Sequence, residues 1–169
     1  MVINSPEPVA VIKKRRNKAL SKLIKSIPYI SFLGVEFDRR GDEITAILPF
    51  KNDLVGNPNL PALHGGSIAA FLEISAIIEL SWMQIWREIE NPKLKADYLI
   101  DLEILSLPKT IDFSVDYLRS GLPRDSYARA KVNRVGRRYA SVHVEAWQDN
   151  RDRLFAPVSY THLTLPTKA

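Results

Sequence analysis

The 169-residue sequence contains no cysteine and only three histidines. Without cysteine, disulfides, thiolate nucleophiles and thiolate metal ligands are all excluded. The histidines are far apart in the sequence, so we expect neither a catalytic zinc nor any other metal. The chain also has no G-x-G-x-x-G loop, no Walker-type loop and no G-x-S-x-G elbow. These absences remove the common signatures of dinucleotide binding, P-loop chemistry and the α/β-hydrolases.

Long apolar runs are also missing, because none approaches the roughly 20 residues that a membrane-spanning helix needs. The first eight residues carry Glu7 and two prolines where a secretory signal would place its apolar stretch. We therefore expect a cytoplasmic protein without a membrane span. The length, with 46% hydrophobic and 25% charged residues, is typical of one globular domain with a buried core.

The formal net charge of +5 suits contact with nucleic acid, an anionic membrane or a small ligand that carries phosphates. Much of this charge lies in residues 11–27, where apolar residues recur at helical spacing opposite a basic face. Residues 1–27 are thus predicted to form a leader and a basic amphipathic helix. No aromatic residues or groove-reading motif accompany the basic run 13–16, so we favour a solvated helix face and expect no nucleic-acid partner.

Residues 28–157 show the alternation of an antiparallel sheet, interrupted by one long helix. The predicted strands are 32–37, 43–50, 110–119, 127–134, 139–148 and one that begins near 153, with a loop at 52–63. Residues 93–107 fit either a short helix or an extra strand. The helix from Ser67 to about Ile89 is apolar on nearly every side, so it belongs inside the protein. The predicted fold is α+β, an antiparallel sheet wrapped around one long central helix.

The end of the chain raises a separate question. Residues 158–167 resemble the translation of a transposase adapter used in sequencing libraries. We hypothesise that residues 158–169 are not native and replace the end of the last strand, which would leave His162 without a biological role. A native strand of similar composition is the alternative, and the same tail encoded in a closed genome would end the hypothesis.

The segment most informative about chemistry is His64-Gly65-Gly66, at the entrance to the long helix. Two glycines let another molecule approach the backbone, because no Cβ stands in the way. The first N–H groups of a helix lack internal partners and lie at the positive end of its dipole, so they can form an oxyanion hole. An ordinary glycine-rich turn, with His64 as a poor cap, accounts for the same residues.

Glu73 favours the catalytic interpretation, because it is an acid in the middle of an apolar helix. Burial of a carboxylate should raise its pKa and make it a better base. A glutamate that faces a solvent gap or pairs with an arginine is the simpler alternative. Glu79 on the same helix is interpreted as a structural or solvent-facing residue.

The spacing of Gly65 and Glu73 constrains how they can act together. Eight positions place them about 12 Å apart along a helix and about 80° out of phase, so they cannot serve one carbonyl from the same chain. If both take part in one reaction, one of them must come from a partner subunit, as a two-fold dimer allows. Catalysis here therefore implies a homodimer.

Several segments resemble the PaaI-like branch of the hotdog-fold thioesterases. They are Leu33-Gly34-Val35, the Asn57-Pro58 loop, Leu63-His64-Gly65-Gly66 with an acid nine positions after the histidine, and residues 111–120, 131–137 and 149–156. The match covers about residues 28–157 and is fairly specific for the family, but not for the substrate. The resemblance implies a hotdog fold, two-fold dimers that often pair into tetramers, and hydrolysis of acyl-CoA thioesters.

Carried over by position, the resemblance makes Glu73 the general base or nucleophile, although the usual acid in this branch is Asp. The Gly65 N–H, with Gly66, would polarise the thioester carbonyl. His64 and a loop asparagine, with Asn57 and Asn59 as rival candidates, would orient the carbonyl or a water.

Three further residues have roles only through the resemblance. Thr110 would assist the acid, and Arg119 and Arg137 would contact the phosphates of coenzyme A. Coenzyme A is part of the substrate, so no separate cofactor is implied.

We expect an acyl-CoA thioesterase that acts on medium-chain or aromatic acyl groups. One alternative is a non-catalytic acyl-CoA-binding or regulatory hotdog protein, whose basic N-terminal helix contacts a partner. Another is a hydratase or dehydratase of enoyl-CoA, because that chemistry also uses a histidine and an acid on this fold. The fold alone does not decide among them.

Overall fold

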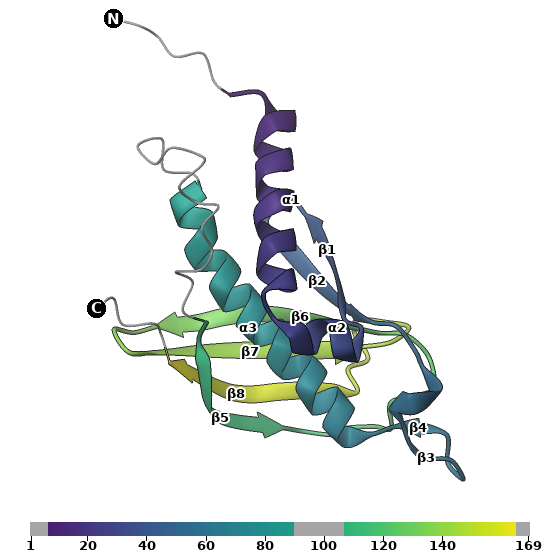
Figure 1. The fold of residues 1–169 in the computed structure, drawn as a ribbon. Helices are drawn as coiled ribbons and strands as arrows, with labels where there is room; N and C mark the ends of the chain where they lie inside the picture. The colour runs from purple at the N-terminus through teal and green to yellow at the C-terminus, as the bar shows by residue number, and fades with distance from the viewer. Residues whose placement is uncertain (1–6, 90–106, 165–169) are drawn as a thin grey trace, which may run out of the picture.

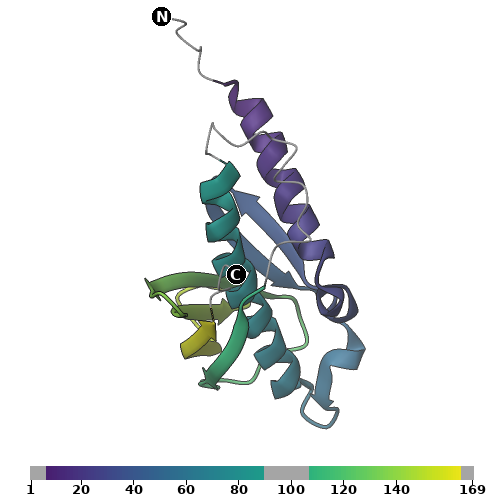
Figure 2. The same cartoon turned by 60° about the vertical axis from the view of Figure 1, so that its left-hand side comes forward.

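The computed structural model describes residues 7–89 and 107–164. Six antiparallel strands form one sheet in the order β1-β2-β6-β7-β8-β5, and the long helix α3 (Gly65–Ile89) lies against it (Figures 1 and 2). The strands are β1 (Glu36–Arg40), β2 (Glu43–Leu48), β5 (Lys109–Val115), β6 (Ser126–Val135), β7 (Tyr139–Trp147) and β8 (Ala156–Thr164). The predicted fold class, an α+β arrangement of a sheet around one central helix, is confirmed.

The core lies between α3 and the inner face of the sheet. On β7, alternate residues from Ala140 to Ala146 are buried while those between them are partly exposed, which is the period-two pattern of a strand covered on one face. Phe71, Leu72 and Ile78 of α3 belong to the same buried cluster. This packing fixes α3 on the sheet, and with it the position of the helix start.

We expected no stretch of the chain to reach the length and apolarity of a membrane-spanning helix, and for α3 this expectation was wrong. Its residues Gly65–Trp86 are long and apolar enough, by length and composition, to pass as a membrane span. Most of this stretch, 61%, is buried inside the molecule. A core helix covered by a sheet passes the same test, so the length of α3 is weak support for a span.

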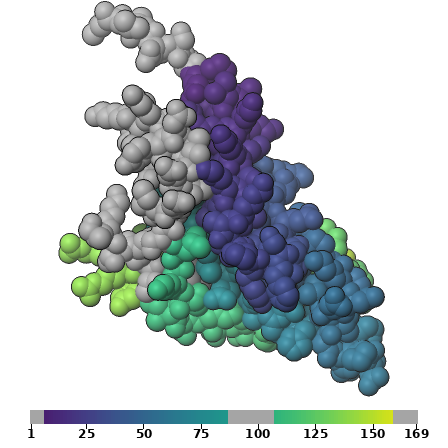
Figure 3. Space-filling model, in the orientation of Figure 1, coloured from purple at the N-terminus to yellow at the C-terminus, as the bar shows by residue number. Residues whose placement is uncertain are grey.

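The helix predicted at residues 11–27 is present as α1 (Val9–Lys25), with Leu20 and Leu23 buried. It lies beside the second half of α3 in both ribbon views, and Figure 3 shows it as a ridge on the surface. The Arg16 guanidinium lies over the Trp86 ring, 5.4 Å from its centroid. Part of the basic face therefore packs against the domain.

The strand predicted at 32–37 was wrong in its first half, because Pro28–Leu33 forms the short helix α2. Pro28 in the first turn favours a helix start, and Gly34 ends the helix at a φ of 78°, where glycine is favoured. A turn at Gly41 and Asp42 joins β1 to β2.

The segment predicted as a loop at 52–63 contains a small hairpin before α3. It consists of the 3-10 turn η1 (Asn52–Leu54) followed by β3 (Val55–Asn57) and β4 (Ala62–Leu63), which pair with each other. Strand β5 is shorter than predicted, because beyond Val115 the backbone donates irregularly to the carbonyls of Phe155 and Pro157 at the start of β8.

Most of the ambiguous segment 93–107 lies outside the described residues. Strand β8 continues past the proposed junction at residue 158, where its register against β5 and β7 shifts, and its backbone pairs with both strands as far as Thr164. Pairing of this kind is open to native and foreign sequence alike, so the origin of residues 158–169 stays a prediction.

Candidate active site

The start of α3 is held by hydrogen bonds from the two residues before it. Leu63 donates its N–H to the Gly121 carbonyl at 2.8 Å, and His64 donates its N–H to the Leu54 carbonyl at 2.7 Å. Gly121 belongs to the segment between β5 and β6, and Leu54 to η1, so two separate parts of the chain fix the first turn of α3 (Figure 1).

His64 caps α3 with its imidazole ring. Its Nδ1 accepts the N–H of Gly66 at 2.9 Å, and its carbonyl accepts the N–H of Ile68 at 3.1 Å. The ring therefore satisfies one of the orphan donors of the first turn. A neutral ring that accepts at Nδ1 carries its proton on Nε2, which leaves Nε2–H to donate to another group.

The His64 ring lies in a slot between two glycines. A Cβ on Gly66 would lie 2.9 Å from Nδ1, and a Cβ on Gly56 would lie 2.8 Å from the His64 Cα. Both distances are too short for any other residue without a shift of the ring or the backbone. We missed Gly56 in the sequence, although a glycine in a strand often marks such a close approach.

Gly65 provides a free backbone donor at the helix start. The Gly66 N–H is taken by His64, whereas the Gly65 N–H makes no hydrogen bond within the described part of the chain. The Gly65 carbonyl accepts the Tyr117 hydroxyl at 2.7 Å, and partial burial raises the pKa of Tyr117, so that hydroxyl stays protonated. Of the two predicted donors, the structure leaves Gly65 available and gives Gly66 a different partner.

The two acids of α3 are not placed as predicted. Glu73 is half-buried rather than enclosed, on the same side of the helix as Ala70 and Ile77. Glu79 was predicted to be structural or solvent-facing, yet burial raises the pKa of its carboxyl group to about 7. Glu79 is half-buried like Glu73, but its helical neighbours Ser75 and Trp82 are buried, so its predicted role as a structural or solvent-facing residue stays a prediction.

Asn57 uses its side chain in a local turn. Its Oδ1 accepts the N–H groups of Asn59 at 3.0 Å and Leu60 at 3.4 Å, which is the pattern of an Asx turn. Asn57 and Asn59 are both exposed at the tip of the β3–β4 hairpin. The structure shows no hydrogen bond from either asparagine to His64 among the described residues, so their predicted role remains untested.

Thr110 lies near the start of the edge strand β5, with a buried hydroxyl. That hydroxyl has no hydrogen-bond partner within the described residues, Glu73 included. A buried hydroxyl without a partner costs free energy, about 1–3 kcal/mol. Thr110 therefore has an unused donor and acceptor, and its predicted assistance to the acid is not seen in a single chain.

Arg119 and Arg137 lie at opposite ends of the sheet. Arg119 follows β5 near the start of β8, whereas Arg137 lies in the turn between β6 and β7, beyond the end of the ten-residue β6. A strand of that length spans about 33 Å, so the two side chains of one chain do not meet at one phosphate.

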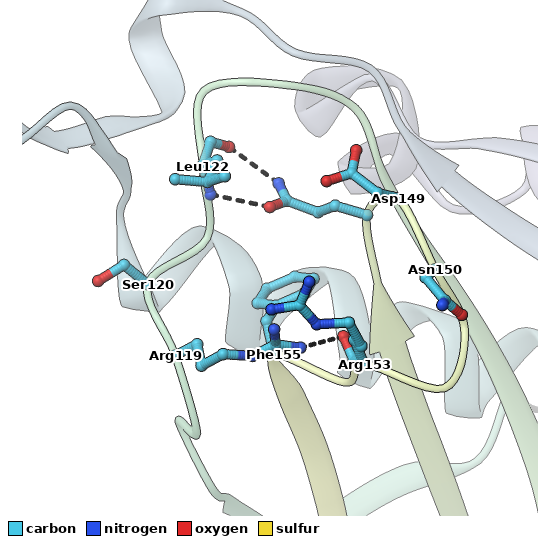
Figure 4. Close-up of a pocket in the computed structure, with 8 residues that line it drawn as sticks. Arg119, Ser120, Leu122, Asp149, Asn150, Arg153 and Phe155 are labelled. Carbon is cyan, nitrogen blue, oxygen red and sulfur yellow. Dashed lines mark hydrogen bonds between the residues drawn. The ribbon is translucent and has the colours of Figure 1, made fainter.

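Arg119 is already occupied by the protein. Its Nε and one Nη donate to the Leu154 carbonyl at 3.2 and 2.7 Å, and the same Nη donates to the Arg153 carbonyl. It lines a surface hollow of about 290 Å³ together with Phe155, Arg153 and others (Figure 4). The Arg153 guanidinium makes no hydrogen bond or ion pair within the described residues, so it is the more available cation of the hollow.

The described residues offer little for a metal. Among them, no group of three or more His, Asp or Glu side chains lies close enough together to hold an ion. His143 lies 3.7 Å from Glu145 on β7, away from the start of α3.

The comparisons with known proteins agree with this architecture. The model of the thioesterase superfamily matches residues 60–154. The medium/long-chain acyl-CoA thioesterase YigI of Escherichia coli K12 is 33% identical over 133 residues, which are 76% of this chain and 79% of the relative.

Solved structures of other proteins have a similar fold. A protein from Chromobacterium violaceum is 31% identical, with a TM-score of 0.60 and coverage of 94% of this chain and 98% of its own. A Bacillus halodurans protein crystallised with CoA is 17% identical, with a TM-score of 0.60 and coverage of 99% and 100%. At that identity the second likeness concerns the fold alone.

The chain belongs to the thioesterase superfamily, since the family model covers more than half of it and includes the start of α3. Its sheet and central helix form the hotdog fold that the sequence resemblance implied. The predicted enzyme class, a thioesterase, is confirmed by the family match and by the named relative.

Proposed function

We propose that this chain hydrolyses medium- or long-chain acyl-CoA thioesters to the free acid and coenzyme A. The observation that carries the proposal is the start of α3, where the Gly65 N–H is free beside a histidine that is fixed by its own hydrogen bond. The name of the Escherichia coli relative supports acyl-CoA as the substrate and favours a longer acyl chain over an aromatic one. We propose no cofactor, because coenzyme A arrives as part of the substrate.

The Gly65 N–H is proposed to bind the thioester carbonyl oxygen. It lies at the amino end of a 25-residue helix, where the dipole favours negative charge. As water adds to the carbonyl carbon, charge develops on that oxygen, and a fixed donor stabilises the transition state more than the ground state. The loss of one such donor typically costs about 10²–10³ in kcat.

Glu73 is proposed to be the general base or the nucleophile. As a base it removes a proton from the attacking water. The tetrahedral intermediate then breaks the carbon–sulfur bond, and the sulfur leaves as the thiolate of coenzyme A, which takes up a proton. Base catalysis by a positioned carboxylate contributes about 10²–10⁴ in rate.

The site is proposed to form between two copies of the chain. Gly65 and Glu73 lie on one straight run of α3, so the separation of about 12 Å expected for eight helical residues applies. The side of α3 that carries Ala70, Glu73 and Ile77 is only partly covered by the chain's own sheet. A second copy related by a two-fold axis would cover this side and bring its own Gly65 to Glu73.

The hollow beside Arg119 is proposed to hold the phosphates of coenzyme A. Arg153 supplies the cation, and Arg119 holds the backbone beside the hollow through its hydrogen bonds to the Leu154 carbonyl. Tyr117 and Arg119 belong to the same short segment after β5, so the hollow adjoins the start of α3. The Bacillus halodurans neighbour of the same fold was solved with CoA, which supports coenzyme A as the ligand proposed here.

Release of free thiol from a panel of acyl-CoAs of increasing chain length tests the proposal. The wild-type protein should turn over medium and long chains, and Glu73→Ala should lose at least about 100-fold. Equal rates for the two proteins would remove Glu73 from the mechanism. Addition of water to enoyl-CoA without thiol release would identify a hydratase instead, and binding without turnover a regulatory protein.

A further inference from the structure

The hydrogen bond from Tyr117 to Gly65 gives Tyr117 a role in the site. Tyr117 lies just after β5 and is held on both sides, because Asp116 donates its N–H to the Pro157 carbonyl at 3.0 Å and Leu118 donates to the Phe155 carbonyl at 2.9 Å. Its hydroxyl then reaches the Gly65 carbonyl at 2.7 Å. The sheet thus places this hydroxyl at the first residue of α3.

The Gly65 carbonyl and the Gly66 N–H are the two ends of one peptide group. The Tyr117 hydroxyl donates to the oxygen end, and the nitrogen end donates to Nδ1 of His64 at 2.9 Å. A hydrogen bond to an amide oxygen polarises the amide and strengthens its N–H as a donor. The three groups therefore form one chain that runs from the tyrosine, through the backbone, to the histidine ring.

This series of hydrogen bonds determines which nitrogen of the neutral His64 ring carries the proton. A strong donor at Nδ1 requires that nitrogen to accept, so the neutral ring is protonated on Nε2. The glycines on either side keep the ring in place, since a Cβ on Gly56 or Gly66 would come within 3.0 Å of it. His64 is exposed, so its Nε2–H can meet a substrate.

We propose that Tyr117 is a positioning residue, which acts through the Gly65–Gly66 peptide to hold His64 as the Nε2–H tautomer that donates to the thioester carbonyl or to the attacking water. The inference rests on the proposed function for its catalytic consequence, but not for the tautomer itself. Tyr117 thus acts on the site by orienting the histidine.

Tyr117→Phe, with Tyr139→Phe as the matched control, tests the proposal by kinetics. The two tyrosines are similarly exposed, 52% and 54%, and the Tyr139 hydroxyl makes no hydrogen bond within the described residues. Tyr117→Phe should lower kcat about tenfold with KM nearly unchanged, as the loss of one hydrogen bond predicts. Tyr139→Phe should behave as wild type. A wild-type kcat for Tyr117→Phe would overturn the proposal.

Nitrogen-15 NMR of the His64 ring supplies a readout that needs no turnover. The wild-type ring, assigned by its absence in His64→Gln, should be the Nε2–H tautomer, and Tyr117→Phe should show a mixture of tautomers. An unchanged tautomer would overturn the proposal. Because this signal is independent of Glu73, it can succeed even if Glu73→Ala retains activity and the proposed function fails.

A double-mutant cycle separates positioning from a general structural effect. If Tyr117 acts through His64, Tyr117→Phe should have almost no further effect on kcat in a His64→Gln background. A full tenfold loss in that background would contradict the proposal, because the tyrosine would then act by another route.

Discussion

At the start of α3, polar groups lie near the surface and make directed hydrogen bonds, whereas in its second half they lie among apolar side chains. Gly66 donates its N–H to His64 at 2.9 Å, and Tyr117 donates its hydroxyl to the Gly65 carbonyl at 2.7 Å. The Ser81 hydroxyl and the Trp86 N–H are buried without a hydrogen-bond partner in the described chain, and burial raises the pKa of Glu79 to about 7. One helix thus carries a surface region of directed hydrogen bonds, which we propose meets the substrate, and a region where buried polar groups cost stability.

The comparison is most informative for the two acids. Both are glutamates on α3, but Glu73 lies on a partly covered side, while Glu79 lies between buried neighbours. We assign the catalytic role to Glu73 because of its proposed position next to the free Gly65 N–H of a partner copy.

The largest expected effect separates these acids by activity. Glu73→Gln keeps the shape of the side chain but removes its charge, and should lower thioester hydrolysis by about 10²–10⁴. Glu79→Gln, the matched control, should stay within about threefold of wild type, since a neutral amide replaces a carboxyl that is already half neutral near pH 7. Thiol release at saturating acyl-CoA measures both. A larger loss for Glu79→Gln than for Glu73→Gln would contradict the proposed role of Glu73.

The second prediction concerns stability and pH. The pKa of Glu79 is raised from 4.5 to about 7, so its ionisation in the folded state is unfavourable. Below pH 4.5 this group imposes no penalty; the penalty grows as the pH rises towards 7 and is constant above it, at about 3 kcal/mol. Glu79→Gln should therefore be more stable than wild type at pH 8, with the difference shrinking towards pH 5. Denaturant unfolding at several pH values measures it, and a pH-independent difference would contradict the account.

The third prediction tests the histidine slot. Gly66→Ala places a Cβ only 2.9 Å from the His64 Nδ1, so the ring must move and the cap is lost. We expect about a tenfold fall in kcat and a loss of about 1 kcal/mol in unfolding free energy. Gly41→Ala is a control that meets no atom within 4 Å, although its φ of 63° brings its own strain. Activity unaffected by Gly66→Ala would show that the ring position is unimportant.

The smallest expected effect concerns the substrate's phosphates. Arg153→Ala should raise KM for acyl-CoA about fivefold and leave kcat nearly unchanged, as the loss of a charge-assisted contact predicts. Arg138→Ala removes an exposed arginine at the far end of the sheet and should change neither constant. Steady-state kinetics at fixed ionic strength compares them. An equal rise in KM for both variants would indicate a general effect of net charge.

Much of the fold could be predicted from the sequence, because hydrophobic periodicity carries it. The apolar helix after His64 and the alternating strands β6 and β7 are within two residues of their predicted bounds. Phe32 and Leu33 were misread as strand, since apolar alternation over so few residues does not distinguish a short helix from a strand. Pro28 and Gly34 were the better signals for that segment.

The site could be predicted only in part. The glycines at the helix start stand out in the sequence, but which N–H remains free depends on the rotamer of His64. The contact from Tyr117 crosses 52 positions, and no local pattern announces it. The partial burial of Glu79 and the hydrogen bonds from Arg119 to backbone carbonyls also depend on tertiary structure, so the sequence does not predict them.

The central claim is that each site joins Glu73 of one copy to the Gly65 N–H of another, and a mixed dimer tests it most directly. Gly65→Pro removes that N–H at a helix position where proline is tolerated, although its ring comes close to Tyr117, which lies 3.4 Å from a Cβ at this position. Glu73→Gln removes the acid. Each variant alone should be nearly inactive. Unfolded and refolded together in equal amounts, they should recover about a quarter of wild-type activity, because half of the dimers are mixed and each has one intact site. No recovery above the separate variants would contradict the account.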